Sequence, residues 1–119
     1  MEISFRRCLI MQFRAIISAS LLLLAFGTAS AVDNHYELTI ANHRFEPAEL
    51  TVPAGVKVKL TVHNKDNNFE EFHSDDLHRE KIVGPNKSGV INIGPLNPGT
   101  YSFMGEFHAD TAQGRIIVK

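Results

Sequence analysis

Residues 98–108 read PGTYSFMGEFH, and this stretch decides the fold that the sequence predicts. It begins in a turn, because Asn97-Pro98-Gly99 is a strong turn-forming sequence. An extended segment follows over residues 100–107, with Tyr101 and Phe103 on its expected core face. A loop over residues 108–114 then leads into an apolar strand over residues 115–118. The end of the chain therefore predicts two consecutive strands joined by a loop that starts at a histidine.

The preceding sequence has the same β character. Apolar and polar side chains alternate cleanly over residues 56–63 and again over residues 35–41, and a period of two is that of a half-buried strand. Residues 75–81 have only Leu77 to bury and are predicted to form a loop, and residues 45–48 a turn. We therefore predict an all-β Greek-key β-sandwich of about seven strands, drawn from residues 35–41, 50–52, 56–63, 69–74, 82–83, 90–93, 100–107 and 115–118.

The first 31 residues have the pattern of a targeting segment. Three arginines precede a mostly apolar run over residues 15–26, and Ala29-Ser30-Ala31 supplies the small residues of a cleavage site. The run is shorter than the ~20 residues that a spanning helix needs. We therefore expect a signal peptide over residues 1–31, with Met1 or Met11 as its start. The mature domain, residues 32–119, is then exported and not embedded in the membrane; an uncleaved anchor is the alternative.

The composition of residues 32–119 narrows the function classes. They contain nine Lys and Arg against twelve Asp and Glu, a net charge of −3, whereas a nucleic-acid-binding protein needs a clustered positive face. No nucleic acid is therefore expected as a partner. The single cysteine, Cys8, lies in the expected signal peptide, so the mature domain has no thiolate. All six histidines remain, and with the carboxylates they are the candidate metal ligands.

The C-terminal stretch resembles the signature of the cupredoxins. In that family a P-G-x-Y-x-F strand runs into a loop that holds Cys, His and usually Met, and a G-x-hydrophobic-x-V strand closes the fold; residues 98–118 are similar to this pattern. Residues 45–55 and 62–66 look like the strand pair and N-x-D loop before the first copper ligand. The resemblance implies a cupredoxin-like fold over essentially all of the mature chain.

The copper ligands of the blue cupredoxins do not carry over by this resemblance. Gly105 stands at the Cys position, Ala112 at the Met position and Glu70 at the first His position. A blue copper centre needs the soft thiolate. We therefore expect no type 1 blue-copper site.

A second resemblance is narrower. Glu70-Glu71-Phe72 together with residues 105–114, GEFHADTAQG, is similar to the EfeO-type cupredoxin-like domains. It implies a periplasmic protein of Ftr-type iron permease systems that binds copper, as Cu(II), and also iron. It implies as partner an inner-membrane iron permease or another periplasmic iron-uptake component. His73 departs from that family, which more often has an acidic residue there.

The metal site is expected where two clusters, residues 70–73 and 104–108, meet at one end of the sandwich. Because a strand has period two, Glu70 shares the face of Phe72 and Glu71 pairs with His73 on the other face. We expect a metal ion to be held from both clusters. Glu70 is the first choice as the inward ligand and His73 the second. Glu106 and His108 can face one point if their strand extends that far. Weaker candidates are Glu71, Met104 and His78; His43 is a loop residue without a role, and His35 and His63 are expected to be solvated.

A set of carboxylates and imidazoles suits Cu(II), Fe or Mn and is too hard for Cu(I). The leading hypothesis is an accessory protein of ferrous-iron uptake that either oxidises Fe(II) with copper or delivers iron to the permease. The glutamates alternatively cap loop amides. A copper chaperone or buffer without redox turnover and a metal-free docking module remain the alternative functions. The mature chain contains no Ser-centred elbow or phosphate-binding glycine loop, so hydrolase and phosphoryl-transfer chemistry are not indicated.

Overall fold

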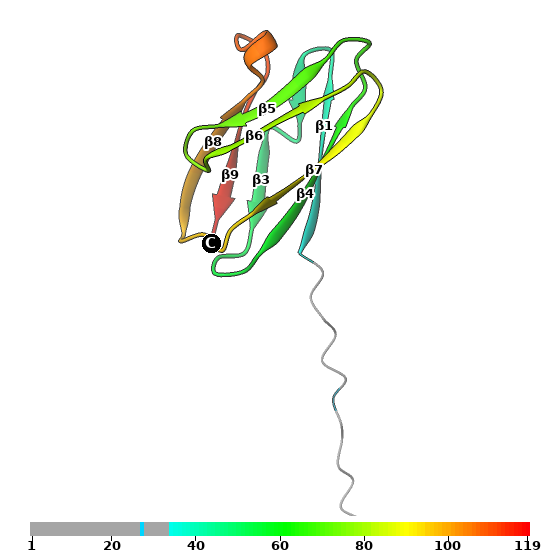
Figure 1. Cartoon of the computed structure of the whole chain (residues 1–119). Helices are drawn as coiled ribbons and strands as arrows, with labels where there is room; N and C mark the ends of the chain where they lie inside the picture. Colours follow the sequence, from blue (N-terminus) through cyan, green and yellow to red (C-terminus); the bar gives the residue numbers. More distant parts are fainter. Residues whose placement is uncertain (1–26, 28–33) are drawn as a thin grey trace, which may run out of the picture. The chain divides into compact units, whose positions relative to one another are not determined.

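The computed structural model describes Gly27 and residues 34–119 (Figure 1). The expected signal peptide, its cleavage after Ala31 and the choice of start lie outside the described residues. Within residues 34–119, nine strands form two sheets, and one short 3-10 helix lies between the last two strands. This confirms the predicted all-β sandwich. No helix in this part of the chain combines the length and apolar character of a membrane span.

Each of the two sheets contains both parallel and antiparallel strand pairs. One sheet has the order β2-β1-β4-β7 and the other the order β3-β9-β8-β5-β6. Only β1 with β4 and β3 with β9 pair in parallel. The first sheet comprises β1 His35–Ala41, β2 Arg44–Glu46, β4 Val58–Asn64 and β7 Ser88–Ile93. The second comprises β3 Glu49–Val52, β5 Glu70–Ser74, β6 Arg79–Val83, β8 Gly99–Met104 and β9 Gln113–Val118.

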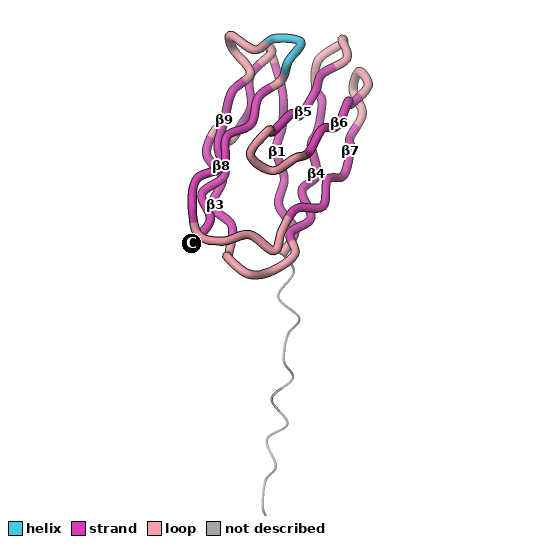
Figure 2. The backbone as a smooth tube through the Cα atoms, turned by 60° about the vertical axis from the view of Figure 1, so that its left-hand side comes forward, coloured by secondary structure: helices cyan, strands magenta, loops and turns pink. Residues whose placement is uncertain are grey.

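The strand directions bring several loops to one end of the sandwich. Because β1 and β4 are parallel, the turn after Ala41 and the loop after Asn64 lie at the same end. The loop after Asn64 leads into β5, and the 3-10 helix η1 (Glu106–His108) follows β8 at this end, as Figures 1 and 2 show. Three segments that are far apart in the sequence thus meet over one edge of the core.

The core between the sheets fixes which face each residue of β5 presents. Phe72 is fully buried and stacks on Phe103 with ring centroids 5.0 Å apart, while Phe45 meets Phe103 edge-on at 4.9 Å. A slip of one residue in β5 would place Phe72 outside and lose this packing. Phe72 therefore sets the register of the two glutamates that precede it.

Three expectations about the elements were wrong in detail. Residues 44–46 form a strand and not only a turn, because the tight turn before them returns the chain along β1. Residues 79–81 belong to β6 and are not loop, since the backbone of β6 pairs along all of β5 although most of its side chains are exposed. The strand expected over residues 100–107 ends earlier, at Met104, and η1 begins at Glu106.

Candidate metal centre

Two clusters of potential metal ligands lie at the end of the sandwich where the three segments meet. We call the first the inner cluster; it consists of His43, Glu70 and His108. We call the second the outer cluster; it consists of Glu71, His73 and Glu106. Within each cluster, one donor atom from each residue lies within 4.8 Å of the others. The clusters share no residue.

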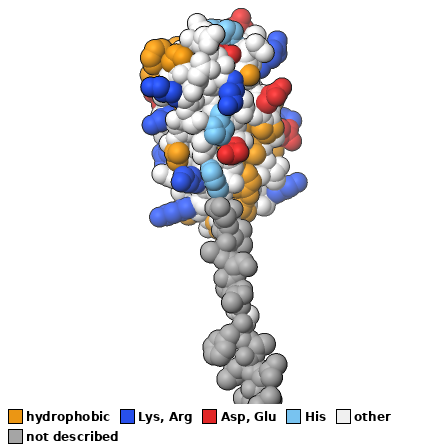
Figure 3. All heavy atoms as spheres, turned by 90° about the vertical axis from the view of Figure 1, so that its right-hand side faces the viewer, with side chains coloured by type: hydrophobic (Ala, Val, Ile, Leu, Met, Phe, Trp, Pro, Cys, Tyr) orange, Lys and Arg blue, Asp and Glu red, His pale blue; other side chains and the backbone are white. Residues whose placement is uncertain are grey.

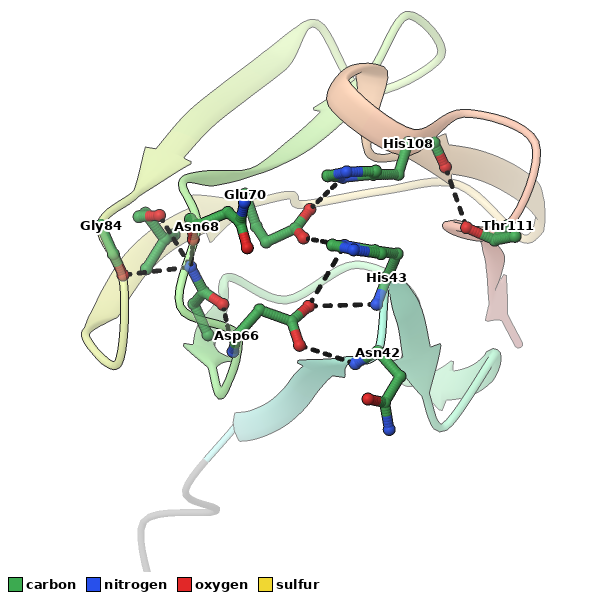
Figure 4. Close-up of polar contacts among 10 residues, drawn as sticks. Asn42, His43, Asp66, Asn68, Glu70, Gly84, His108 and Thr111 are labelled. Atoms are coloured by element: carbon green, nitrogen blue, oxygen red, sulfur yellow. Dashed lines mark hydrogen bonds and ion pairs between the residues drawn. The ribbon is translucent and has the colours of Figure 1, made fainter.

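Glu70 stands at the centre of the inner cluster. Its side chain is 1% exposed, and its two oxygens each accept from a different imidazole: His43 Nδ1 donates to Oε1 at 2.6 Å and His108 Nδ1 to Oε2 at 3.2 Å (Figure 4). The rings of His43 and His108 stack with centroids 3.5 Å apart. Glu70 comes from β5, His43 from the turn between β1 and β2, and His108 from η1, so this cluster joins all three segments.

His43 reaches the cluster because of the turn that carries it. Asn42 and His43 are the two loop residues of the β1–β2 hairpin, with φ of 51° and 58°, the conformation that suits a two-residue hairpin. The carboxylate of Asp66 accepts from both backbone N–H groups of this turn, from Asn42 at 2.7 Å and from His43 at 3.0 Å. Burial acts to raise the pKa of Asp66, but these two donors outweigh it and hold that pKa below its ordinary value.

Asp66 is in turn positioned by Asn64, a buried residue at the end of β4. The side-chain amide of Asn64 donates to the carbonyl oxygens of Asn68, Val83 and Gly84, and its Oδ1 accepts from the backbone N–H of Asp66. Figure 4 shows this network beneath the histidines. The N-x-D loop therefore acts as a support that fixes the β1–β2 turn, and hence His43, relative to Glu70.

His108 is positioned by the compact loop between β8 and β9. The carbonyl of His108 accepts from the N–H groups of Thr111 and Ala112, and Gly105 N–H donates to the carbonyl of Ala112 at 2.9 Å. A Cβ on Gly105 would lie 3.0 Å from the carbonyl oxygen of Glu71 and 3.1 Å from the Cβ of Ala112. Gly105 therefore lets the start of this loop lie close to the backbone of β5.

The outer cluster lies on the opposite face of β5. Glu71 is 3% exposed, His73 is partly buried, and Glu106 of η1 is exposed. His73 Nδ1 lies 4.0 Å from Glu71 Oε1, and His73 Nε2 lies 3.7 Å from Glu106 Oε1. Asp75 adds a third carboxylate, which accepts from His73 Nε2 at 2.9 Å. Carboxylates therefore face His73 from both its own strand region and η1.

The pKa values in the outer cluster follow from this concentration of acidic groups. Burial is the largest of the causes that raise the pKa of Glu71 to about 7, and the neighbouring carboxylates of Glu80 and Glu106 supply the rest. The hydrogen bond to Asp75 raises the pKa of His73, against an opposing effect of burial and with support from the charges of Glu106 and Asp75. Among residues 34–119, neither Glu71 nor Glu106 has an ion pair with lysine or arginine.

The four main candidate ligands are divided between the two clusters. Glu70 and His108 lie in the inner cluster, whereas His73 and Glu106 lie in the outer one. Glu106 and His108 do not converge, because residues 106–108 form a 3-10 turn and not a strand. Residues two apart in a helix with about three residues per turn project in different directions. One short helix therefore supplies each cluster with one residue.

The weaker candidates fall near the outer cluster or outside both. Glu71 is a member of the outer cluster, and Met104 pairs directly with His73 across the strands while remaining 37% exposed. His78 is exposed in the β5–β6 turn with φ of 53° and belongs to neither cluster, although it lines a surface pocket together with His73.

Sequence reasoning assigned no role to His43, which the structure places against Glu70. The signal available was the pair Asn42-His43 between two strand-forming segments, which is a hairpin turn pattern.

Two further histidines lie on the first sheet, away from both clusters. His35 hydrogen-bonds with Thr61, and His63 hydrogen-bonds with Ser88 and Glu37. Figure 3 shows charged and histidine side chains scattered over the side that is on the right in Figure 1.

Comparisons with known proteins agree with this architecture. The family model of the cupredoxin-like domain matches residues 14–118. The uncharacterized protein RP394 of Rickettsia prowazekii (strain Madrid E) is 50% identical over 94 residues, which cover 77% of this chain and 75% of that protein.

Two solved structures have the same fold at low identity. Reduced auracyanin from Roseiflexus castenholzii superposes with a TM-score of 0.61 at 18% identity, covering 72% of this chain and 97% of auracyanin. The metal-binding domain of the Streptococcus pneumoniae Cu(I)-exporting P-type ATPase CopA, solved with Cu(I), gives a TM-score of 0.61 at 17% identity, covering 71% of this chain and 84% of that one. With a family match over most of its length, the chain belongs to the cupredoxin-like domain family.

Proposed function

We propose that the mature chain is a periplasmic protein that binds copper through the inner cluster and serves ferrous-iron uptake. The observation that carries this proposal is the convergence of His43 and His108 on the buried carboxylate of Glu70. The partner is an inner-membrane iron permease or another periplasmic iron-uptake component, as the resemblance to EfeO-type domains implies.

The donor set of the inner cluster suits Cu(II). Two imidazoles and one carboxylate are borderline to hard ligands, and Cu(II) is the divalent first-row ion that such sets bind most tightly. The two contacts between the imidazoles and Glu70, 2.6 and 3.2 Å, are close to the ~3 Å that separates neighbouring ligands around a metal with bonds of about 2.1 Å. A cation can thus bind the two Nδ1 atoms and Glu70 after small side-chain movements, with the proton of each neutral imidazole on Nε2.

The same cluster does not suit a blue copper centre. Residues 34–119 contain no cysteine. By the resemblance, Gly105 stands at the position of the blue-copper cysteine, and a Cβ added there would press on Glu71 and Ala112. Bound at nitrogen and oxygen ligands, Cu(II) supplies a one-electron acceptor of ordinary, weakly coloured type. We therefore expect a copper protein without the intense absorption that a thiolate produces.

Copper titration of residues 32–119 tests the proposal. We expect one Cu(II) per chain, with a paramagnetic resonance spectrum of nitrogen and oxygen ligation. Glu70→Gln and His108→Ala should each weaken binding, whereas His35→Ala, which removes an exposed imidazole that contacts only Thr61, should not. Equal affinity of Glu70→Gln, His108→Ala and wild type would contradict the assignment.

The role in iron uptake requires separate measurements. Fractionation and the mass of the protein purified from its own cells should place residues 32–119 in the periplasm. Under air, with dioxygen as final electron acceptor, the copper-loaded protein should consume Fe(II) faster than the apoprotein if it acts as an oxidase. Tight copper binding without this acceleration indicates the chaperone or buffer. No increase in melting temperature with any metal indicates the docking module, because a ligand that binds only the folded state must stabilise it.

A further inference from the structure

We propose that the outer cluster is a second and separate metal site, which binds a hard, exchangeable divalent cation through Glu71, His73 and Glu106. The chain then has two metal sites at one end of the sandwich and not one. That the natural cation is Fe(II) rests on the proposed function; that the site binds a hard divalent cation does not.

The geometry of the three side chains is that of a site that a small movement completes. Their donor atoms lie within 4.8 Å of one another. His73 Nδ1 lies 4.0 Å from Glu71 Oε1, whereas the 3.7 Å approach of Glu106 Oε1 is to Nε2, the other ring nitrogen. Neighbouring ligands on one cation lie about 3.0 to 3.4 Å apart when metal–ligand bonds are about 2.1 Å. Donor atoms that are at most 4.8 Å apart therefore have to approach one another by less than about 2 Å. Glu106 is free to move because it is exposed.

An unpartnered buried atom points independently to a ligand. His73 Nδ1 is buried and has no hydrogen-bond partner, and it is the sole such side-chain nitrogen or oxygen found among the described residues. Buried polar atoms are nearly always paired, and an unpaired one calls for an explanation such as a missing ion. The closest acidic group is Glu71 at 4.0 Å, too far for a hydrogen bond. A cation bound by both would satisfy the orphan nitrogen and neutralise the buried carboxylate.

The chemistry of the outer cluster differs from that of the inner one. It offers two carboxylates and one imidazole, with a further carboxylate on Asp75, whereas the inner cluster offers two imidazoles and one carboxylate. Carboxylate-rich sets favour hard ions such as Mn(II), and additional imidazole favours borderline ions such as Cu(II). Two ions with different ligand preferences would thus be sorted between the two faces of β5.

Exposure suggests that the outer site exchanges its ion. Glu106 is 53% exposed, and a surface pocket lined by His73, Asp75, Asp76, Ser102, Phe103 and Met104 opens beside His73. Asp75 and Asp76 place negative charge at this opening, which favours the approach of a cation. Glu70 by contrast is 1% exposed beneath two stacked rings. The outer site fits a cargo ion and the inner site a resident one.

Mn(II) is a suitable probe, because it is a hard divalent ion that does not oxidise in the assay and its free form has a sharp paramagnetic resonance signal. We would titrate Mn(II) into residues 32–119 with one equivalent of Cu(II) already bound. We expect one further site per chain, and a loss of at least about tenfold in affinity in Glu106→Gln and in Glu71→Gln. Glu46→Gln, which removes an exposed carboxylate on β2, is the charge-matched control and should bind as wild type.

The outcomes separate this proposal from the proposed function. Mn(II) binding that is weakened by Glu70→Gln but not by Glu106→Gln would overturn the outer site, as would the absence of saturable Mn(II) binding by wild type. Glu106 is exposed, so a folding defect cannot account for the effect of Glu106→Gln; thermal melts check Glu71→Gln. Fe(II), added under anaerobic conditions to the copper-free Glu70→Gln variant that carries one Mn(II), should displace Mn(II) one for one. Failure of the copper titration alone would leave the outer site standing.

Discussion

Glu70 and Glu71 are neighbours in the chain and lie in different chemical environments. Both side chains are nearly fully buried. Glu70 lies on the face of β5 that carries Phe72 and accepts from two imidazoles, whereas Glu71 lies on the opposite face beside His73. The difference arises from the alternation of a strand, whose register is fixed by Phe72. One strand can therefore present two unlike ligand sets, provided that other segments complete each of them.

The two clusters are also held in place by different segments of the chain. The inner cluster depends on the N-x-D loop and the β1–β2 turn, which hydrogen bonds fix in place. The outer cluster depends on η1, which follows Gly105 where the chain passes close to the backbone of Glu71 in β5. Substitutions in one support should leave the other cluster intact, except at η1, which serves both.

The largest expected effect is a cross-over between the two glutamates. Glu70→Gln should weaken Cu(II) binding by at least about 100-fold, because the loss of even an outer-shell partner costs roughly 10- to 100-fold in metal affinity. It should leave Mn(II) binding unchanged. Glu71→Gln should do the reverse. Isothermal titration of both ions into both variants measures the cross-over, and a variant that weakened both ions equally would show a single shared site.

A smaller effect, common to both clusters, is expected from Gly105→Ala. The new Cβ would lie 3.0 Å from the Glu71 carbonyl oxygen and 3.1 Å from the Ala112 Cβ, so η1 must shift away from β5. Overpacking of this kind costs about 1 to 3 kcal/mol of unfolding free energy, and both ions should bind roughly tenfold more weakly. Gly99→Ala is the matched control, because its Cβ would meet only Tyr101 at 3.7 Å. Denaturant unfolding and metal titration of both variants provide the comparison; unchanged binding in Gly105→Ala would show that η1 does not position the ligands.

The support of the inner cluster is tested more gently by Asp66→Asn. The amide keeps the shape of the carboxylate but loses its charge and one of its two acceptor oxygens, which now accept from Asn42 and His43. Hydrogen bonds to charged groups contribute about 1.5 to 3 kcal/mol, part of which the amide oxygen retains. We expect Cu(II) affinity to fall by about fivefold, with Mn(II) binding unchanged. Asp110→Asn, in the exposed loop after η1, should alter neither; a change in Mn(II) binding by Asp66→Asn would mean that the supports are not independent.

The sequence predicted the sandwich and the end at which the ligands gather, because alternation and turn residues are local signals. It did not predict that Glu106 and His108 separate. That outcome depends on the end of β8 at Met104 and on the compact loop closed by Ala112, where a non-local contact with β5 decides the path of the chain.

His43 illustrates the same limit from another direction. Its hairpin turn has a local signature, but its contact with Glu70 spans 27 residues and requires Asp66 to fix the turn. The pairing of Glu71 with His73 on one face needed only strand periodicity, and the structure places them so. Which residues share a site thus follows from sequence only where one element carries them all.

The smallest expected effect is a difference in the pH dependence of stability of the apoprotein. The pKa of Glu71 is raised from 4.5 to about 7 in the folded state, so the folded protein holds this proton more tightly, and the contribution of Glu71 declines as pH rises from 4.5 to 7. The raised pKa of His73 acts in the same sense: its contribution is complete below 6.5 and is lost as pH rises through the folded-state value. Asp66 acts oppositely, since its lowered pKa gives stability above 3.8 that is lost in acid.

The unfolding free energy of the apoprotein should therefore fall in acid because Asp66 is protonated, and fall toward neutral pH because Glu71 and His73 lose protons. Between pH 5 and 7, Glu71→Gln should reduce the decline in unfolding free energy by about 1 kcal/mol for each pH unit, the slope of one titrating proton. Denaturant melts of apoprotein at pH 5, 6 and 7 measure this difference, and Glu46→Gln should retain the wild-type slope because its carboxylate is exposed. A slope that Glu71→Gln leaves unchanged would mean that Glu71 is ionised without cost, and the contrast between the two glutamates would then rest on their ligands alone.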